Sequence, residues 1–280
     1  ADPSAPRSRR VRTLALPLPL LLLLAGCVAL PAADDAPTAR ATVLPWQLTE
    51  CRYLVGWSDA DPALVQANLP DGFTVRSGAP LGLPLATAAA ARASIGTETF
   101  ECASGSGLDG TIEGMTYASI WIPVTLPEAL ADPEIDEVYY KIHVVVPDAP
   151  RRELMRSLGL SVGNGTMAWE TALVPNGLAS SLTIEGAGDF VLELTAPQQT
   201  ATGPGRRFIE VTPAGERGAD GFAIWRTQFE WVGDSYAFGQ GTIEWPEGHW
   251  VTQAIGSPRA PAQFHAGVWS FDGTVELPSR

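Results

Sequence analysis

Short segments rich in aromatic and β-branched residues follow one another beyond residue 43, and Gly, Pro and Asn separate them. From residue 166 onward they recur roughly every ten residues, the spacing of antiparallel sandwiches and barrels. The pattern predicts a mainly β fold (β-rich α+β): an antiparallel β-barrel or cone, or a sandwich, with two short helices. A Gly-rich stretch at 104–110 is expected to separate two strands. The expected strands are 51–57, 73–75, 97–102, 115–124, 138–146, 167–173, 178–185, 190–195, 208–212, 223–232, 235–244 and 267–277.

The two helices are predicted from their end signals. At the first, Asp61 is an N-cap candidate and Pro62 stands in the first turn. This helix ends before the turn signal at 70–72. The second helix covers 151–158 and stops at Gly159, since glycine favours helix ends.

The first 30 residues carry a different pattern, in which a basic segment precedes an apolar run that ends in small residues. This order is typical of a secretory signal peptide. A membrane-spanning helix is the alternative, but Pro17 and Pro19 interrupt the run and Arg12 lies inside it. The sequence Leu24-Ala25-Gly26-Cys27 resembles a bacterial lipobox. This resemblance implies that Cys27 carries a diacylglyceryl group and begins the mature protein.

We therefore divide the chain into a signal peptide at residues 1–26, a tether at 27–42 and one globular domain at 43–280. The tether starts with lipidated Cys27 and is rich in Ala, Pro and Asp, a composition typical of disorder. Two acyl chains anchor a protein stably to a bilayer. The expected location is the bacterial cell envelope, at the outer face of the cytoplasmic membrane or on the periplasmic side.

Acidic residues outnumber basic ones, with 31 Asp and Glu against 18 Lys and Arg and a formal net charge of −13. Such a surface repels nucleic-acid phosphates, whose binding depends on Lys and Arg contacts. It also opposes charge-driven adhesion to an anionic membrane, so the lipid must supply the anchor. We expect no nucleic-acid partner, and we retain the membrane and a small molecule as partners.

The number of cysteines is consistent with an exported protein. If Cys27 is lipidated, Cys51 and Cys102 remain as a pair. An even pair in an exported protein predicts a disulfide. A metal or redox site is the alternative, but the sequence has no CxxC motif and its histidines show no ligand spacing with the cysteines.

Motifs for nucleotide and zinc-peptidase chemistry do not occur in the sequence. It has no Gly-rich phosphate loop, no GxGxxG between strand and helix and no HExxH. We therefore expect no cofactor and no bound metal.

One strand carries the candidate chemistry. Alternation along it places Tyr139, Lys141 and His143 on one face together with Val145. A lysine desolvated inside a barrel would have a lowered pKa and could form a Schiff base, with His143 as acid or base. The same face could equally be the solvent-facing side of an antiparallel sheet. Tyr139, Lys141 and His143 are the candidate pocket, and Lys141 and His143 are the candidate catalytic residues.

The two remaining histidines are expected in loops beside aromatic side chains. Such aromatic residues either line an apolar ligand pocket or, more often, pack in the core. The dispersed spacing of the histidines gives no specific prediction of zinc. The residues concerned are His249, His265, Trp245, Trp250, Phe264 and Trp269.

The segment 64–73, LVQANLPDGF, resembles the opening of acetoacetate decarboxylase-like proteins. In that family a short helix ends in a Leu-Pro-x-Gly-Phe turn before the first core strand. The later order is also similar: a long strand at 138–146, a helix that ends in glycine at 151–159, and then antiparallel strands. The resemblance spans roughly residues 46 to 277 and implies a closed, cone-like β-barrel around an internal cavity.

The resemblance does not extend to the catalytic residues. In the true decarboxylases one lysine forms the Schiff base and a neighbouring lysine lowers its pKa. Here Lys141 is the only lysine in the chain, and Ile142 follows it. If the fold is right, the resemblance therefore implies binding of a small molecule in the cavity more than decarboxylation.

Three functions remain at this point. The first is a membrane-anchored lipoprotein that binds a small apolar or acidic molecule in an internal cavity without catalysis. The second is an acetoacetate decarboxylase-like enzyme that uses Lys141 as its Schiff-base lysine. The third is a structural or adhesion lipoprotein of the envelope with no small-molecule site.

Overall fold

A computed structural model describes the chain at residues 42–77, 92–108, 110–126, 135, 137–171, 178–199, 206–214, 221–231 and 237–278. These residues belong to one compact unit, Ala39–Arg280. The predicted signal peptide, the lipidated Cys27 and nearly all of the tether lie outside the described residues. The segment 78–91 also lies outside them.

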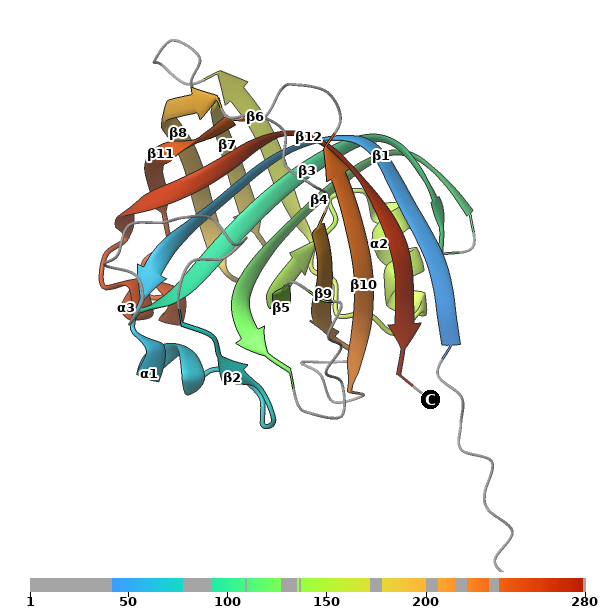
Figure 1. Cartoon of the computed structure of the whole chain (residues 1–280), viewed down its shortest axis with the longest axis horizontal. Coiled ribbons are helices and arrows are strands. Elements are labelled where there is room, and N and C mark those ends of the chain that lie inside the picture. Colours follow the sequence, from blue (N-terminus) through green and yellow to red (C-terminus); the bar gives the residue numbers. More distant parts are fainter. Residues whose placement is uncertain are drawn as a thin grey trace, which may run out of the picture. The chain divides into compact units, whose positions relative to one another are not determined.

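The described residues form twelve strands and three helices (Figure 1). The strands are β1 (Thr42–Ala60), β2 (Thr74–Val75), β3 (Ala93–Gly107), β4 (Gly110–Thr125), β5 (Glu137–Val145), β6 (Gly165–Thr171), β7 (Leu178–Ile184), β8 (Gly188–Gln199), β9 (Arg206–Pro213), β10 (Phe222–Trp231), β11 (Ala237–Glu244) and β12 (Arg259–Leu277). The helices are α1 (Pro62–Gln66), α2 (Ala149–Ser157) and α3 (Trp250–Ile255).

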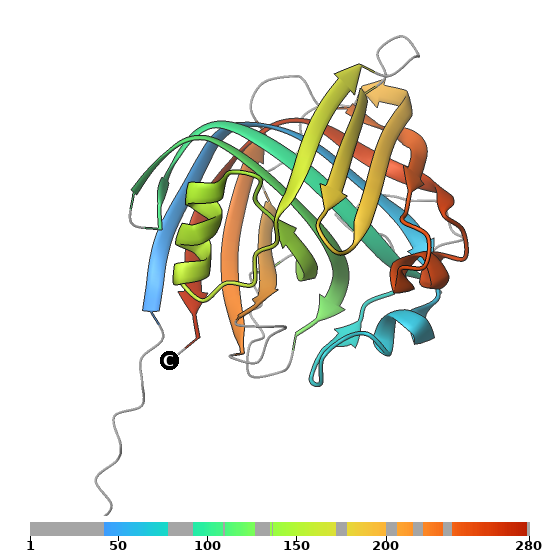
Figure 2. The ribbon, with the colours of Figure 1, turned by 180° about the vertical axis from the view of Figure 1, so that it is seen from behind.

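Seven of the strands close into a barrel. They pair in the order β1-β3-β4-β5-β9-β10-β12, and a further pairing of β1 with β12 completes the ring. Neighbours in the ring are antiparallel except β5 and β9, which run parallel. The predicted mainly β fold with a barrel is confirmed. Beyond the ring, β12 also pairs with β11, and the sheet continues through β8 and β7 to β6 (Figures 1 and 2).

The barrel wall separates two apolar clusters. The interior cluster is drawn from the seven barrel strands, the short segments that flank them and the α2 region, and it includes Trp46, Phe100 and Met155. The outer cluster joins the other face of the wall to β7, β8, β11, α1 and α3, and it includes Phe190 and Phe264. Each barrel strand supplies side chains to both clusters, because successive side chains of a strand point to opposite faces of the sheet.

The predicted N-cap of α1 and the predicted glycine at the end of α2 are both confirmed, whereas α2 starts two residues earlier than predicted, after an Asp148 cap. The Asp61 carboxylate accepts the backbone N–H groups of Ala63 and Leu64 at the start of α1. Asp148 accepts the N–H of Arg151 at the start of α2. Such caps satisfy N–H groups that have no partner within the helix.

Two local predictions were wrong. A third helix, α3, occupies 250–255, where we expected a loop. The expected Gly-rich break at 104–110 is instead a continuation of the hairpin, since β3 extends to Gly107 and β4 starts at Gly110. Gly105 explains why glycine occurs inside a strand here: a Cβ at this position would lie 2.5 Å from the carbonyl oxygen of Gln47 on β1.

The predicted disulfide between Cys51 and Cys102 is present. The two cysteines face each other directly in the pairing of β1 with β3. Both belong to the interior cluster and are buried. The bond therefore joins two neighbouring barrel strands across a sequence separation of 51 residues.

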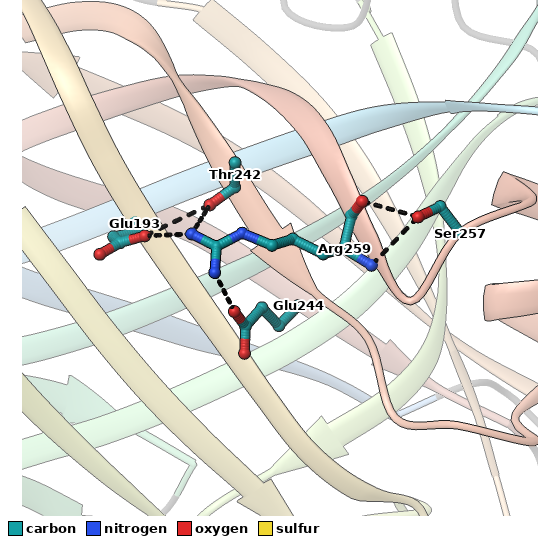
Figure 3. A network of polar contacts seen from close by, with 5 residues as sticks. All are labelled: Glu193, Thr242, Glu244, Ser257 and Arg259. Carbon is teal, nitrogen blue, oxygen red and sulfur yellow. Dashed lines mark hydrogen bonds and ion pairs between the residues drawn. The ribbon is translucent and has the colours of Figure 1, made fainter.

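A surface network ties β8 and β11 to the start of β12 (Figure 3). The Arg259 guanidinium lies 2.6 Å from Glu244 Oε1 and 3.0 Å from Glu193 Oε2, and it also donates to the Thr242 hydroxyl at 3.3 Å. Because these groups are largely open to solvent, each pair contributes about 0–1 kcal/mol. Within the described residues, no helix has the length and apolar character that a membrane crossing requires.

Candidate functional site in the barrel interior

Lys141 lies inside the barrel, where only 1% of its side chain is exposed. Strand β5 carries it, and strands β3, β4 and β9 supply its partners. Its ammonium forms an ion pair with Glu98 and lies 2.6 Å from Glu210 Oε1. It also donates to the Ser119 hydroxyl at 3.1 Å. An ammonium has three N–H donors, so all three have an acceptor here.

The acceptors of Lys141 are themselves connected. The Ser119 hydroxyl donates to Glu98 Oε1 at 2.6 Å, so Glu98 receives hydrogen bonds from both neighbours. The Tyr117 ring lies on the same side, with its centroid 5.8 Å from the Lys141 ammonium. We call Lys141, Glu98, Glu210, Ser119 and Tyr117 the interior ionic cluster.

Electrostatics keep Lys141 protonated. Burial alone would lower the pKa of Lys141, but the charges of Glu210 and Glu98 outweigh burial and raise that pKa above its ordinary value. Burial raises the pKa of Glu98, and the opposing effect of Lys141 is smaller. Burial likewise raises the pKa of the Tyr117 hydroxyl. The lowered lysine pKa expected for a Schiff-base nucleophile is not found, and the sequence-based expectation is corrected on this point.

An internal cavity of about 50 Å³ adjoins the cluster. All seven barrel strands contribute to its mostly apolar lining, which includes Glu98 and Glu210. A second cavity, of about 30 Å³, shares both glutamates with the first. Lys141 lines neither cavity, although both of the glutamates that pair with it do.

His143 does not join Lys141, contrary to the alternation predicted along this strand. The pairing of β4 with β5 contains a bulge: Ile120 pairs with His143, whereas Trp121 pairs with Lys141. The extra residue of β5 shifts the alternation, as a β-bulge does. Past the bulge, Val144 belongs to the interior cluster.

On the outer side of the wall, His143 meets the start of α3. Its ring centroid lies 5.6 Å from that of His249. His249 is the N-cap of α3, and its Nδ1 accepts the N–H of Val251 at 3.3 Å. Burial and the neighbouring His249 lower the pKa of His143 to about 4. Burial also lowers the pKa of His249.

We expect this histidine pair to make stability depend on pH. The unfolded chain protonates His143 near its ordinary value of about 6.5, whereas the folded chain does so only near pH 4. The free energy of unfolding should therefore fall as the pH drops from about 6.5 towards 4, by at most about 1.4 kcal/mol per pH unit for one histidine. Denaturant unfolding at pH 7.5 and 5.5 measures this slope. His143→Gln should flatten it, and an equal slope in both proteins would contradict the assignment.

The other candidate residues have structural surroundings. Tyr139 faces the interior, and its hydroxyl donates to Glu137. His265 was expected in a loop, but it lies in β12, is 2% exposed and packs between the rings of Trp57 and Phe238.

The four aromatic residues beside the histidines serve mainly in packing. Trp245, Phe264 and Trp269 are buried in the two clusters, and Trp250 packs against the outer one. No group of three or more His, Cys, Asp or Glu side chains in the described part is arranged to hold a metal ion.

Fold and site together define a closed β-barrel with a buried ionic cluster beside an internal cavity. No family model matches the sequence, and no curated protein matches it. Among solved structures, the chain is similar to the enduracididine biosynthesis enzyme MppR. Its complex with pyruvate is 13% identical, with a TM-score of 0.51 over 89% of this chain and 94% of that one. Its complex with a condensation product of pyruvate and imidazole 4-carboxaldehyde is also 13% identical, with a TM-score of 0.51 over 84% and 89%.

Acetoacetate decarboxylase-like proteins are also among the structural neighbours. An acetoacetate decarboxylase-like enzyme from Sphingomonas wittichii RW1 is 16% identical, with a TM-score of 0.49 over 85% of this chain and 92% of that one. At these identities the likeness shows the fold alone.

Proposed function

We propose that this chain is a binding protein that holds a small molecule inside its barrel without forming a covalent bond to it. The observation that carries the proposal is the way in which the Lys141 ammonium is paired inside the barrel. Its ammonium is paired with Glu98 and Glu210, donates to Ser119 and does not line the cavity. Lys141 then serves to balance the buried carboxyl groups, and the cavity beside them receives the ligand.

Schiff-base chemistry makes demands that this arrangement opposes. The reacting lysine must be a neutral amine within reach of the substrate carbonyl. Both glutamates pair with the ammonium and line the cavity, whereas Lys141 does not line it, and their charges raise the pKa of Lys141. A substrate would have to displace at least one of them. No second lysine exists to lower that pKa.

The enzymatic alternative has one observation in its favour. The only lysine lies inside a barrel whose fold is shared with MppR, a protein solved in complex with pyruvate. Borohydride reduction with pyruvate or acetoacetate, followed by mass spectrometry, tests this alternative. We expect no adduct on Lys141. Lys141→Arg is the matched control, because it keeps the cation and cannot form a Schiff base. An adduct at Lys141 of the native chain, absent from Lys141→Arg, would overturn the binding proposal in favour of the enzyme.

We also propose that the protein is exported and lipid-anchored in the bacterial cell envelope. Two observations support this proposal: the lipobox-like sequence that ends in Cys27, and the buried disulfide between Cys51 and Cys102. Structural disulfides persist in oxidising compartments. Mass spectrometry of the mature N-terminus should find a diacylglyceryl group on Cys27, and Cys27→Ser should release the protein from membranes. An unmodified Cys27, or cleavage elsewhere, would refute the proposal.

A further inference from the structure

The larger internal cavity has walls that are almost entirely apolar. Of the fifteen described residues that line it, eleven are hydrophobic, and several of these are aliphatic, such as Leu48, Leu108 and Val144. Helix α2 (Figure 2) and the segment that follows it add Met155 and Leu160. Water finds few hydrogen-bond partners on such walls, and apolar cavities in proteins accept apolar guests such as benzene and xenon. The lining therefore favours a ligand that is itself apolar.

The two glutamates in the lining do not reverse this preference, because protein groups already meet their hydrogen bonding. Glu98 pairs with Lys141 and accepts the Ser119 hydroxyl at 2.6 Å. Glu210 Oε1 lies 2.6 Å from the same ammonium. A charged ligand would compete with Lys141 for these carboxyl groups, and it would also lose its hydration on entering the barrel. An uncharged apolar ligand avoids both costs and leaves the interior ionic cluster intact.

Two methionines make part of the wall adaptable. Met115 on β4 and Met155 on α2 both line the cavity, and they are 4% and 5% exposed. Methionine is unbranched and polarizable, so its side chain adjusts to apolar surfaces of irregular shape. The only other methionine in the chain, Met167, packs against the outer cluster. Two of the three methionines therefore face the cavity, and the third marks the other side of the barrel wall.

The cavity sets the size of the ligand. One water needs about 10–15 Å³ of cavity measured in this way, so a cavity of about 50 Å³ holds about four heavy atoms. We propose that the barrel interior binds a compact, uncharged hydrocarbon of about this size, with Met115 and Met155 as the adaptable part of its wall. This inference rests on the proposed binding function. Of the apolar and acidic ligands expected from the sequence, it retains the apolar one.

Four probes with four heavy atoms each test the inference: 2-methylpropane, 1-propanol, propylamine and acetate. The protein carries ¹³C-labelled methionine methyl groups, and each probe is titrated at neutral pH while the methyl NMR signals are recorded. We expect 2-methylpropane to shift the signals of Met115 and Met155 saturably and to leave that of Met167 in place. A hydroxyl loses its hydrogen bonds to water in an apolar cavity, and a charge loses more. The other three probes should therefore bind at least about tenfold more weakly, which corresponds to about 1.4 kcal/mol.

Met155→Ala removes part of the wall and should enlarge the cavity, as large-to-small substitutions in a core do. We expect benzene to bind this variant at least about tenfold more tightly than it binds the native chain, measured on the Met115 signal. Met167→Ala makes the same change outside the barrel and should leave the affinity for benzene at its native value. The comparison of the four probes needs no variant, so it decides the inference even if Met155→Ala does not fold.

The outcomes separate this inference from the proposed function. If 1-propanol, propylamine or acetate binds as tightly as 2-methylpropane, the apolar inference is overturned and the binding function stands. If 2-methylpropane shifts the Met167 signal as strongly as the other two, or if benzene binds Met155→Ala no better than the native chain, the placement of the ligand beside Met115 and Met155 is overturned. If none of the four probes binds, the proposed binding function fails together with the inference.

Discussion

Lys141→Met is expected to lower the free energy of unfolding by about 3–5 kcal/mol, the usual cost of removing one partner from a buried ion pair. The substitution leaves Glu98 and Glu210 facing each other in the barrel interior without a cation. For a domain of this size, the melting temperature should fall by roughly 2–4 °C per kcal/mol. Denaturant unfolding and calorimetry at pH 7.5 measure both quantities.

The loss of unfolding free energy caused by Lys141→Met should become smaller as the pH falls. Burial raises the pKa of Glu98, and Lys141 opposes this effect, so the pKa of Glu98 rises further in the folded variant without the ammonium. The folded variant then takes up a proton that the unfolded chain still lacks. Lower pH therefore stabilises the variant relative to the native chain. Comparing the two proteins at pH 7.5 and 5.5 tests this sign.

Two further variants keep this prediction falsifiable. Arg52→Met breaks the pair of Arg52 with Glu101, whose side chains are 53% and 50% exposed, and should cost about 1 kcal/mol or less. Adding Glu98→Gln and Glu210→Gln to Lys141→Met removes the uncompensated charges and should recover part of the loss. If Lys141→Met is as mild as Arg52→Met, the interior ionic cluster does not carry the stability assigned to it.

The short-range features of this fold could be predicted from the sequence because their causes are local. Asp61 with Pro62 marks the start of α1, and the Asp148 cap and Gly159 bound the region of α2. Strand positions follow from apolar alternation and turn residues. The disulfide could be predicted from the cysteine count once Cys27 is set aside. None of these features depends on which strands become neighbours.

The interior ionic cluster could not be predicted in this way because its members come from four strands. Glu98 and Ser119 stand 43 and 22 residues before Lys141, and Glu210 reaches it through the parallel pairing of β5 with β9. One sequence signal was available: Glu98 is in phase with Phe100 and Cys102, which both belong to the interior cluster. A charge in an apolar phase indicates a buried partner, but it does not say which residue that partner is.

The position of His143 depends on the partner strand. Alternation along β5 alone places His143 beside Lys141, and the prediction failed because of a bulge in the pairing with β4. A bulge inserts one residue relative to the neighbouring strand, so a pattern in a single strand does not reveal it. The same bulge separates the two candidate catalytic residues.

Loss of the disulfide between Cys51 and Cys102 is expected to lower the free energy of unfolding by about 4 kcal/mol. The bond closes a loop with a sequence separation of 51 residues, and the chain-entropy model assigns this value to a loop of that length. The test compares oxidised and reduced protein in guanidinium unfolding. Cys51→Ala with Cys102→Ala serves as the control, because reductant should have no effect on this double variant.

The denaturant dependence distinguishes the two ways in which the bond could act. If the bond restrains the unfolded chain, the reduced protein exposes more surface on unfolding, and its m-value should be larger than that of the oxidised protein. If the loss comes only from packing around the buried sulfurs, the m-value stays constant and only the midpoint moves. Reductant that changes neither quantity would show that the bond between β1 and β3 adds nothing to the stability of the barrel, even though Cys51 and Cys102 face each other in the strand pairing.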